Sequence, residues 1–388
     1  MYLSLLNPRL WFRFFYFLWL YKSFIIKLIF RREIEVEKFF PVVRESGPVV
    51  IKLAQWLSQR SDIFSTSVVK ELRGLQTHCS EYPLEELFSC LKPKHRQMLI
   101  IDPKPIGIGT IAQVHRATYE GRELIIKIRH PNIIDVMQTD LTILYWLTRS
   151  FTKVLNTDDL SHIYEQVFLS NEAKYLTKLE DIFFNDTVIR LPVMIYACDE
   201  YIIQTYCPGV HLNEVATDKY IEARSAVFLA FCKMVKYGII HGDLHDGNIL
   251  FDNNLIHLLD FGMMISLSEK EIWLVMEFLR GYYHLYTSGT IEHLVKAIGN
   301  FRKNHLERPT PELLHAISAI VTQVITRKDK ITLINLNTLP PLLNDIFNLH
   351  GLHISNNVLH VLLTLPIIEA NITNEYNIDF IGNILLKL

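Results

Sequence analysis

Eight consecutive residues carry the strongest chemical signal in this 388-residue chain: His241-Gly242-Asp243-Leu244-His245-Asp246-Gly247-Asn248. Asp260-Phe261-Gly262 follows, beginning twelve residues after Asn248. Transfer of a phosphoryl group to a hydroxyl needs a carboxylate beside the nucleophile and oxygen ligands for Mg²⁺, whose charge balances that of the phosphate. We therefore expect Asp243 to position or deprotonate the acceptor, and Asn248 and Asp260 to hold the metal.

The same residues have two other interpretations. Asp, Asn and Gly dominate turns, so either motif alone is also typical of an ordinary turn. Alternatively, His241, Asp243 and His245 are ligands of a transition metal. The pair of motifs at this separation disfavours ordinary turns, and the transition-metal interpretation leaves Asp-Phe-Gly unused. Asp243 and Asn248 have the spacing found in kinase catalytic loops.

A second group of residues lies upstream and complements the first. Gly107-Ile108-Gly109-Thr110 is a small-residue turn in which backbone N–H groups can approach phosphates. Lys127 lies in the apolar run Leu124-Ile125-Ile126-Lys127-Ile128, where a lysine is costly unless it has an anionic partner. A nucleotide phosphate and Glu172 are the expected partners. The alternative is an edge-strand lysine that reaches solvent.

The pattern of apolar residues predicts the elements that position these groups. Strands are expected at residues 111–118 and 123–129 around the hairpin turn Tyr119-Glu120-Gly121-Arg122, and at residues 188–196, 201–206, 249–251 and 256–259. Helices are expected over residues 36–100, 133–155 and 160–179, and over most of the chain beyond the break at Cys207-Pro208-Gly209. A β-rich half followed by a helical half predicts an α+β fold with two lobes that face a ligand-binding cleft.

Composition narrows the class of protein. The 39 Lys and Arg against 41 Asp and Glu give a net charge of −2, so no basic field favours a nucleic-acid partner. The five cysteines are scattered without a Cys-x-x-Cys pair, which indicates buried thiols in a reducing compartment rather than disulfides or a zinc site.

Residues 1–35 form a basic and strongly aromatic segment that lacks acidic residues before Glu33. Only the eight residues 14–21 are uninterrupted by charge, too few for a transmembrane helix. At about 100° per residue, Arg9, Arg13, Lys27 and Arg31 share one stripe, as in an interfacial helix with a basic face. An organelle-targeting segment and a helix that buries its aromatic face on its own protein are the alternatives.

Together these residues resemble the aarF/ABC1/UbiB family of atypical protein-kinase-like proteins, from about Val42 to the C-terminus. Lys52-Leu53-Ala54-Gln55 is similar to the family's Lys-x-Gly-Gln. The family's nucleotide loop corresponds to Gly107-Ile108-Gly109-Thr110, followed by the well-matched Ile111-Ala112-Gln113-Val114-His115. Lys127 with His130-Pro131 matches the third-strand lysine segment, and Glu172-Ala173 matches the Glu-Ala of the facing helix.

The resemblance implies a two-lobed protein-kinase-like fold in which an N-terminal helical extension covers the active-site cleft, with Lys52 and Gln55 pointing into it. The expected domains are the membrane-associating or targeting segment 1–35, the extension 36–103, the N-lobe 104–208 and the C-lobe 209–388. Lys127, Glu172 and Asp243 would be catalytic and Asn248 and Asp260 would bind metal. The nucleotide would be bound by Gly107, Gly109, Thr110, Lys127, Gln204, Tyr206, Lys52 and Gln55.

The resemblance also implies a function. Expected cofactors are ATP or ADP with Mg²⁺, and the expected activity is an atypical phosphotransferase or ATPase linked to ubiquinone or lipid metabolism. Expected partners are a membrane or a lipid- or quinone-type small molecule, and proteins of a lipid-synthesis complex. The expected location is intracellular and membrane-associated, with a mitochondrion or another organelle as the compartment.

Three departures from the family pattern concern regulation. Ala54 replaces a glycine, Gln166 and Phe168 stand where the family has Glu-x-Asp, and Gly107 and Gly109 replace alanines. The two glycines resemble the branch of the second human aarF-domain-containing kinase. A nucleotide-binding pseudokinase scaffold and a soluble small-molecule kinase of the aminoglycoside or choline type are the alternative functions, and the Lys52–Gln55 motif disfavours the latter.

Overall fold

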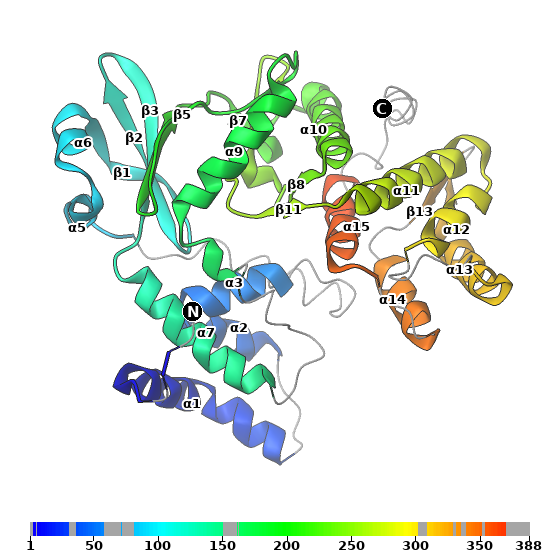
Figure 1. The fold of residues 1–388 in the computed structure, drawn as a ribbon, viewed down its shortest axis with the longest axis horizontal. Helices are drawn as coiled ribbons and strands as arrows, with labels where there is room; N and C mark the ends of the chain where they lie inside the picture. Colours follow the sequence, from blue (N-terminus) through cyan, green and yellow to red (C-terminus); the bar gives the residue numbers. More distant parts are fainter. Residues whose placement is uncertain are drawn as a thin grey trace. The chain divides into compact units, whose positions relative to one another are not determined.

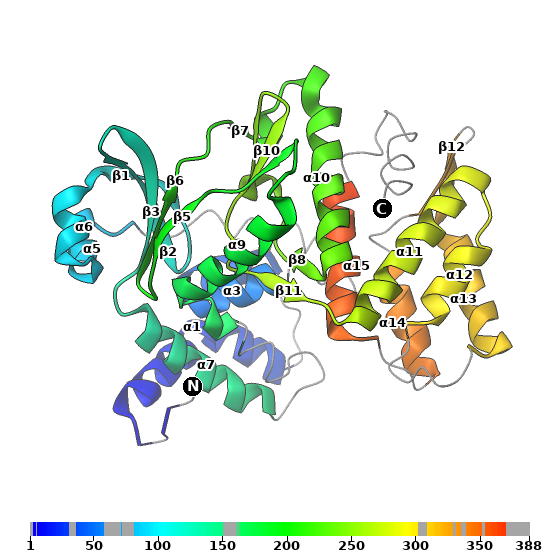
Figure 2. The same ribbon diagram turned by 45° about the horizontal axis from the view of Figure 1, so that its top comes forward.

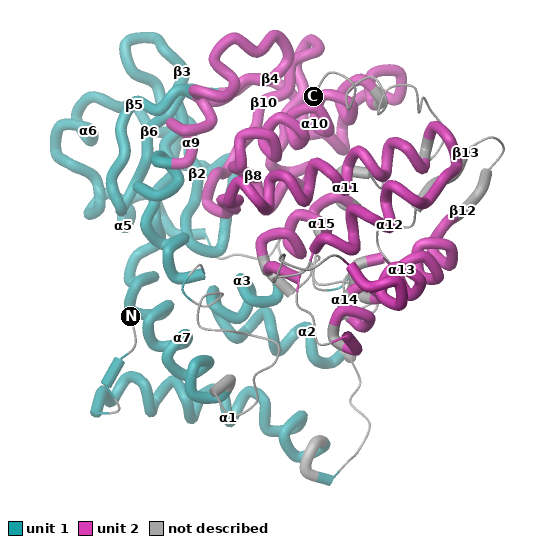
Figure 3. The backbone as a smooth tube through the Cα atoms, turned by 45° about the vertical axis from the view of Figure 1, so that its right-hand side comes forward, with its two compact units in different colours: residues 1–60, 64–174, 193–206 teal, residues 61–63, 175–192, 207–388 magenta. Residues whose placement is uncertain are grey.

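The computed structural model describes residues 3–4, 6–30, 36–57, 71, 81–149, 161, 163–301, 309–328, 331–334, 339–350 and 354–369. The chain divides into two compact units, coloured separately in Figure 3. Unit 1 comprises residues 1–60, 64–174 and 193–206, and unit 2 comprises residues 61–63, 175–192 and 207–388. Each unit is described below by itself.

The centre of unit 1 is a five-stranded antiparallel sheet with the strand order β1-β2-β3-β6-β5 (Figure 1). Its strands are β1 (Ile100–Ile108), β2 (Ala112–Tyr119), β3 (Arg122–Arg129), β5 (Met194–Ala197) and β6 (Tyr201–Thr205). Glu120 and Gly121 both have positive φ, 49° and 76°, as a tight two-residue hairpin turn requires. The predicted hairpin between β2 and β3 is therefore confirmed.

One face of this sheet is closed by helices α5 (Leu84–Leu87) and α6 (Pro93–Met98), joined by the short turn η2 (Phe88–Cys90); Figure 2 shows them on one side of the strands. The cluster buried there comprises Leu84, Leu87, Leu91, Ala117, Leu124, Ile126, Ile128, Tyr201 and Ile203. Side chains alternate along a strand, so the neighbours of Leu124, Ile126 and Ile128 in β3 point to the opposite face. Lys127 is one of these neighbours, so its side chain points to the sheet face opposite the one that α5 and α6 cover.

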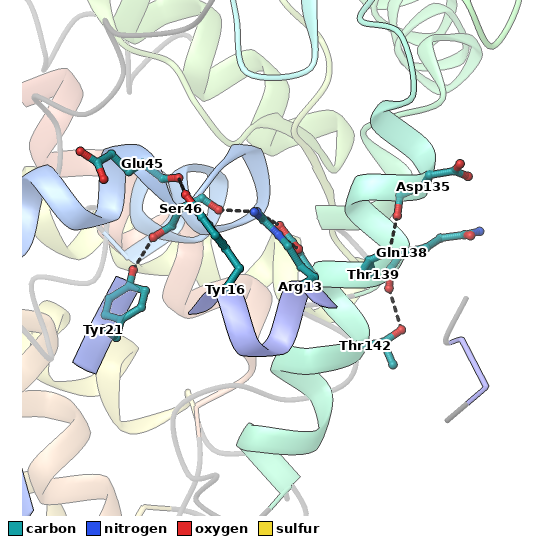
Figure 4. Close-up of polar contacts among 10 residues, drawn as sticks. Arg13, Tyr16, Tyr21, Glu45, Ser46, Asp135, Gln138, Thr139 and Thr142 are labelled. Atoms are coloured by element: carbon teal, nitrogen blue, oxygen red, sulfur yellow. Dashed lines mark hydrogen bonds and ion pairs between the residues drawn. The ribbon is translucent and has the colours of Figure 1, made fainter. Parts of the chain in front are cut away.

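Unit 1 also contains the N-terminal helices α1 (Pro8–Ile29), α2 (Val36–Glu45) and α3 (Pro48–Leu57), which pack with α7 (Ile133–Arg149). Arg13 joins them: its Nε and Nη2 lie 2.7 and 2.8 Å from the two carboxylate oxygens of Asp140 on α7. Nη2 also donates to the Ser46 carbonyl at 2.6 Å, and the hydroxyls of Tyr21 and Ser46 are hydrogen-bonded (Figure 4).

This contact corrects the expectation of an outward basic face on α1. Arg9 pairs with Asp135 and Arg13 with Asp140, so these members of the basic stripe face α7 of the same unit. Asp140 is fully buried, which makes an anchoring cation necessary. Arg31 lies outside the described residues. Among the described residues, no helix combines the length and apolar character needed to cross a membrane.

Unit 2 contains a four-stranded sheet with the order β4-β10-β9-β7 and the two-stranded pairs β8–β11 and β12–β13. Its helices are α10 (Thr217–Tyr237), α11 (Glu269–Ser288), α12 (Glu292–Gly299), α13 (Pro311–Val324), α14 (Leu339–Leu349) and α15 (Asn356–Glu369). The strands are β4 (Ile189–Arg190), β7 (Val210–His211), β8 (Ile239–His241), β9 (Ile249–Asp252), β10 (Leu255–Leu258), β11 (Met264–Ser266), β12 (Ile325–Lys328) and β13 (Ile331–Ile334). Helix α9 (Leu169–Phe183) belongs to unit 1 up to Lys174 and to unit 2 from Tyr175.

Strands β9 and β10 match the two predicted apolar runs. Three expectations differ from the structure: β1 precedes the first strand expected, which began at residue 111; the helix expected over residues 160–179 is interrupted between residues 163–165 and α9; and β7, β8 and β11–β13 occur where helix was expected. These five strands have two to four residues each, too few to show an alternating pattern that sequence analysis could detect.

Candidate functional site

The first part of the candidate site is an ion pair within unit 1. Lys127 Nζ lies 2.7 Å from Glu172 Oε2, and their side chains are 16% and 3% exposed. Lys127 comes from β3, and Glu172 comes from the first turn of α9, where the helix dipole favours a negative charge. The start of α9 is fixed because the Leu169 N–H donates to the Asp199 carbonyl at 3.2 Å. The structure thus brings together two of the three residues expected to be catalytic.

The sheet face that carries Lys127 also carries Gln204. Lys127 is paired with Val114 and Ile202, and Ile125 with Gln204, so these side chains share one face. Gln204 is only 4% exposed, and its Oε1 has no hydrogen-bond partner within the described part of the chain. A buried acceptor without a donor is unfavourable, so a ligand donor would stabilise it.

Val114 and Ile125 were not singled out from the sequence, although both are half-buried on this face. The alternation of side chains along a strand identifies them. Ile125 lies two positions before Lys127 on β3, and Val114 lies directly opposite Lys127 on β2, so both side chains are on the same face as Lys127. If Lys127 binds phosphates as expected, these apolar side chains on the same face are suited to contact a flat base.

The nucleotide loop, defined here as residues 107–111, joins β1 to β2. The Gly109 N–H donates to the Ala112 carbonyl at 2.8 Å, which closes a tight turn. A Cβ on Gly109 would lie 3.2 Å from that carbonyl oxygen, so glycine fits the close approach. Gly107 lies opposite Val114 in the β1–β2 ladder, and Thr110 is half-buried beside the turn.

Tyr206 directly follows β6, and its ring contacts a cation rather than the nucleotide loop. The Arg116 guanidinium lies 4.5 Å from the centre of the ring, and Arg116 Nη2 donates to the hydroxyl at 2.8 Å. Lys52 is half-buried on α3, and the side chain of Gln55 lies outside the described residues. Nucleotide binding by these three residues stays a prediction.

The second part of the candidate site lies in unit 2, in the loop after β8. His241 is fully buried: its Nε2 donates to the Leu259 carbonyl at 2.9 Å, and its Nδ1 accepts from the Asp243 N–H at 3.2 Å. Burial lowers the pKa of this imidazole. The neutral ring therefore fixes the backbone at Asp243, whose carboxylate remains partly exposed.

The two expected metal ligands lie at one end of the β9–β10 hairpin. Leu259 donates its N–H to the Asn248 carbonyl at 2.9 Å, so Asn248 is bonded to the residue that directly precedes Asp260. The Asn248 Nδ2 donates to the Asp243 carbonyl at 2.9 Å, which leaves Oδ1 as the amide's ligand atom. Asp260 has a φ of 55°, in the left-handed region, and its Oδ1 accepts from the Gly262 N–H at 3.2 Å. Such local bonds are what allow an aspartate to adopt this conformation.

The alternative of a transition-metal site does not fit this loop. Both ring nitrogens of His241 are engaged with backbone groups, so neither is a ligand atom. His245 Nδ1 accepts from the Gly247 N–H at 3.0 Å, and its Nε2 is 3.7 Å from Asp243 Oδ2. In the described ranges there is no group of three His, Cys, Asp or Glu residues arranged to hold a metal ion.

Two residues, Arg224 and Gly242, support this loop in ways that were not predicted from the sequence. Arg224 on α10 is buried and pairs with Asp246 at 2.6 Å. Gly242 donates its N–H to the Met263 carbonyl at 2.8 Å, and an added Cβ there would lie 3.2 Å from that oxygen. The strand pair β8–β11 creates this close approach, which explains why the loop reads His-Gly-Asp.

An antiparallel sheet with a lysine–glutamate pair, together with a catalytic loop and an Asp-Phe-Gly turn, defines a kinase-like protein. The family model described as "ABC1 atypical kinase-like domain" matches residues 75–294, more than half of the chain. The chain therefore belongs to the ABC1 atypical kinase-like family, and the predicted family and kinase-like α+β fold are confirmed.

Individual relatives agree with this assignment. The Arabidopsis thaliana protein named ACTIVITY OF BC1 COMPLEX KINASE 7, chloroplastic, is 26% identical over 72% of this chain and 46% of its own length. A probable protein kinase UbiB from Cronobacter sakazakii is 26% identical over 59% of this chain and 48% of its own length. The chain thus spans less than half the length of these two relatives. A solved complex of Rv3197 with erythromycin, from Mycobacterium tuberculosis, covers 75% of this chain and 83% of its own at 16% identity, with a TM-score of 0.47.

Proposed function

We propose that this protein binds Mg²⁺ and ATP and acts as an atypical phosphotransferase or ATPase at a membrane surface, in lipid or quinone metabolism. The observation that carries the proposal is the shielded ion pair between Lys127 and Glu172. A shielded lysine that a carboxylate holds in place on a sheet face is a rigid point charge for phosphates. Among the named relatives, the probable kinase UbiB and the BC1 complex kinase support this class of function.

The protein's own residues have separate roles in this proposal. Lys127 binds the nucleotide phosphates, and Glu172 keeps its amine in place. Asp243 accepts a hydrogen bond from the acceptor hydroxyl or from water and orients it for attack on the terminal phosphorus. The buried neutral His241 fixes the backbone that carries Asp243.

The donor set at Asn248 and Asp260 fits Mg²⁺ because hard cations prefer amide and carboxylate oxygens. The bond from Asn248 Nδ2 to the Asp243 carbonyl turns Oδ1 outward as a ligand. When bound, the ion would neutralise charge on the transferred phosphoryl group.

Gln204 supports a nucleotide with an exocyclic amine. Its buried Oε1 has no hydrogen-bond partner among the described residues and can accept from the amino group of adenine. Val114 and Ile125, on the same sheet face, would contact the plane of the base.

The exposed side of α1 supports a membrane surface as partner. Its exposed large apolar residues include Phe12 at 80% and Trp19 at 60%, together with Trp11, Phe15, Leu18 and Ile26. Lys22 lies in this stripe with its amine over the Trp19 ring, and α1 contains no acidic residue. Aromatic side chains with a neighbouring cation suit the interfacial region of a bilayer. A chloroplastic relative supports an organelle location.

A titration with ATP in the presence and absence of Mg²⁺, followed by an ATPase assay with vesicles, tests the catalytic part. We expect tighter binding with Mg²⁺ and turnover that vesicles increase. Binding without turnover would instead favour the pseudokinase scaffold. Failure of the intact chain to bind either nucleotide form would overturn the proposal.

Co-sedimentation of the full chain with phosphatidylcholine vesicles, with and without anionic lipid, tests the membrane part. The triple variant Phe12→Ser/Phe15→Ser/Trp19→Ser should remain in the supernatant. Trp273→Ser, which removes a half-exposed tryptophan from α11 in unit 2, is the matched control and should sediment like the wild type. Equal sedimentation of the triple variant and the wild type would contradict membrane contact through α1.

A further inference from the structure

A single histidine, His130, is hydrogen-bonded to the backbone of the nucleotide loop. His130 directly follows β3 and is 4% exposed. Its Nε2 donates to the Gly109 carbonyl at 2.9 Å, and its backbone N–H donates to the Ile111 carbonyl at 2.8 Å. Two carbonyls of the loop, one on each side of Thr110, are therefore fixed by one residue.

This attachment determines which way the amide of Thr110 points. In a planar trans peptide, the C=O of one residue and the N–H of the next point in opposite directions. Because the Gly109 carbonyl points to the buried ring of His130, the Thr110 N–H points away from that ring. A backbone N–H with this direction is a suitable donor to a phosphate oxygen.

Tyr82 holds His130 from another direction. The two rings lie 4.7 Å apart, centre to centre. The backbone of Tyr82 is bound at both polar atoms by the side chain of Gln113: its N–H donates to Oε1 at 3.0 Å, and its carbonyl accepts from Nε2 at 2.9 Å. Residues 81–83, which precede α5, are thereby attached to the strand that leaves the loop.

The attachment extends one step further across the sheet. Gln113 Nε2 lies 2.8 Å from His115 Nε2, and His115 Nδ1 lies 2.7 Å from the Asp102 carbonyl in β1. Gln113 and His115 are both fully buried. A continuous set of contacts therefore runs from β1 through the Tyr82 segment to the Gly109 carbonyl.

We infer that His130 is a positioning residue for phosphate binding, which sets the direction of the loop amides through the Gly109 and Ile111 carbonyls, and that Tyr82 acts through it. The inference rests on the proposed nucleotide binding and adds the residues that shape the loop. His130 itself contacts the loop and not the nucleotide.

A comparison of ATP with adenosine separates positioning from general stability, because adenosine lacks the phosphates. In calorimetric titrations of the full chain, His130→Leu should weaken ATP binding about tenfold, since it removes one buried hydrogen bond. Adenosine binding should change less than about twofold, since the base contacts are on the sheet face. His130→Gln keeps a donor near the position of Nε2 and should recover most of the ATP affinity.

Tyr82 provides a second pair of variants with a matched control. Tyr82→Phe keeps the ring and both backbone bonds and should bind ATP like the wild type. Tyr82→Ala removes the ring contact and should weaken ATP binding several-fold while adenosine binding is kept. These two variants decide the matter if His130→Leu does not fold.

The possible results are distinct. If the wild type binds neither ATP nor adenosine, the proposed function fails and this inference fails with it. If the wild type binds ATP but His130→Leu weakens ATP and adenosine by the same factor, the role of His130 is structural only and the inference is wrong. Unchanged ATP affinity in both His130→Leu and Tyr82→Ala would also overturn it.

Discussion

The two parts of the candidate site are constructed in different ways. In unit 1, Lys127 and Glu172 are 45 residues apart in the sequence. They meet because the fold brings β3, which carries Lys127, next to the first turn of α9, which carries Glu172. In unit 2, Asp243, Asn248 and Asp260 lie within residues 243–260 and are positioned by one loop and one hairpin. The second part is local and can be recognised from spacing, whereas the first depends on how the elements pack.

The two parts nevertheless share one structural feature, a buried histidine that is hydrogen-bonded to the backbone. In each, a buried histidine donates from Nε2 to a loop carbonyl at 2.9 Å: His130 to Gly109 in unit 1, and His241 to Leu259 in unit 2. Burial lowers the pKa of both imidazoles. A neutral ring can fill an apolar space while it still fixes one backbone group, so both loops are held without a buried charge.

The largest effect is expected from the local part. Asp260→Asn replaces a carboxylate with a neutral amide, so turnover of Mg²⁺-ATP should fall by about 10²–10³-fold. Stability should change little because Asp260 is exposed. A steady-state ATPase assay and thermal unfolding measure the two quantities.

The matched control for Asp260→Asn is Asp252→Asn, at the opposite end of the β9–β10 hairpin, which should keep wild-type turnover. Turnover in Asp260→Asn equal to that of Asp252→Asn would show that the carboxylate of Asp260 has no catalytic role.

In the long-range part of the site, formed by Lys127 and Glu172, we expect a substitution to lower the free energy of unfolding. Glu172→Ala leaves the partly shielded amine of Lys127 without its carboxylate. Breaking a buried pair costs about 3–5 kcal/mol, and the 16% exposure of Lys127 reduces this to about 2 kcal/mol. Hydrogen exchange should rise in β3 and at the start of α9, and stay unchanged in β9 and β10.

The double variant Lys127→Met/Glu172→Ala tests the cause of that loss. It leaves no unpaired charge, so it should recover part of the free energy of unfolding. A double variant as unstable as the sum of the two single variants would mean that the residues do not interact.

A glycine substitution compares the packing of the two loops. An added Cβ at Gly242 would meet the Met263 carbonyl oxygen at 3.2 Å, so Gly242→Ala should lower the free energy of unfolding by about 1–2 kcal/mol. Gly107→Ala, whose added Cβ would meet nothing closer than 3.9 Å, is the control and should be less destabilised. Equal losses in chemical denaturation would contradict this difference.

The smallest expected effect concerns pH and unit 1. The folded state keeps His130 neutral because burial lowers its pKa, while the unfolded chain protonates it near its ordinary pKa of about 6.5. Stability should therefore fall as the pH decreases from about 7.5 to 5.5, by about 1 kcal/mol from this residue.

His130→Gln removes the titrating ring and is the variant for this measurement. Urea unfolding at several pH values should give a shallower decline for His130→Gln than for the wild type. Parallel curves would mean that His130 titrates alike in the folded and unfolded chain.

Several features were predictable because they depend on neighbours in sequence. The hairpin at Glu120 and Gly121 follows from local residue types, and so do the loop at residues 241–248 and the turn at residues 260–262, whose catalytic role stays a prediction. The direction of α1 was not predictable: the basic stripe indicated an outward polar face, whereas Asp140, 127 residues away from Arg13, attracts it inward.

The amino-acid sequence by itself determined the family, and it predicted the class of chemistry and the residues of the local part of the site, because motif spacing and side-chain period act over a few residues. Only the tertiary structure decided that Lys127 meets Glu172, that His130 and Tyr82 hold the nucleotide loop, and that α1 turns Arg13 inward and Phe12, Phe15 and Trp19 outward. These contacts join residues far apart in the chain. They form because a buried charge, ring or carbonyl needs a partner, and the packing of strands and helices decides which distant residue supplies it.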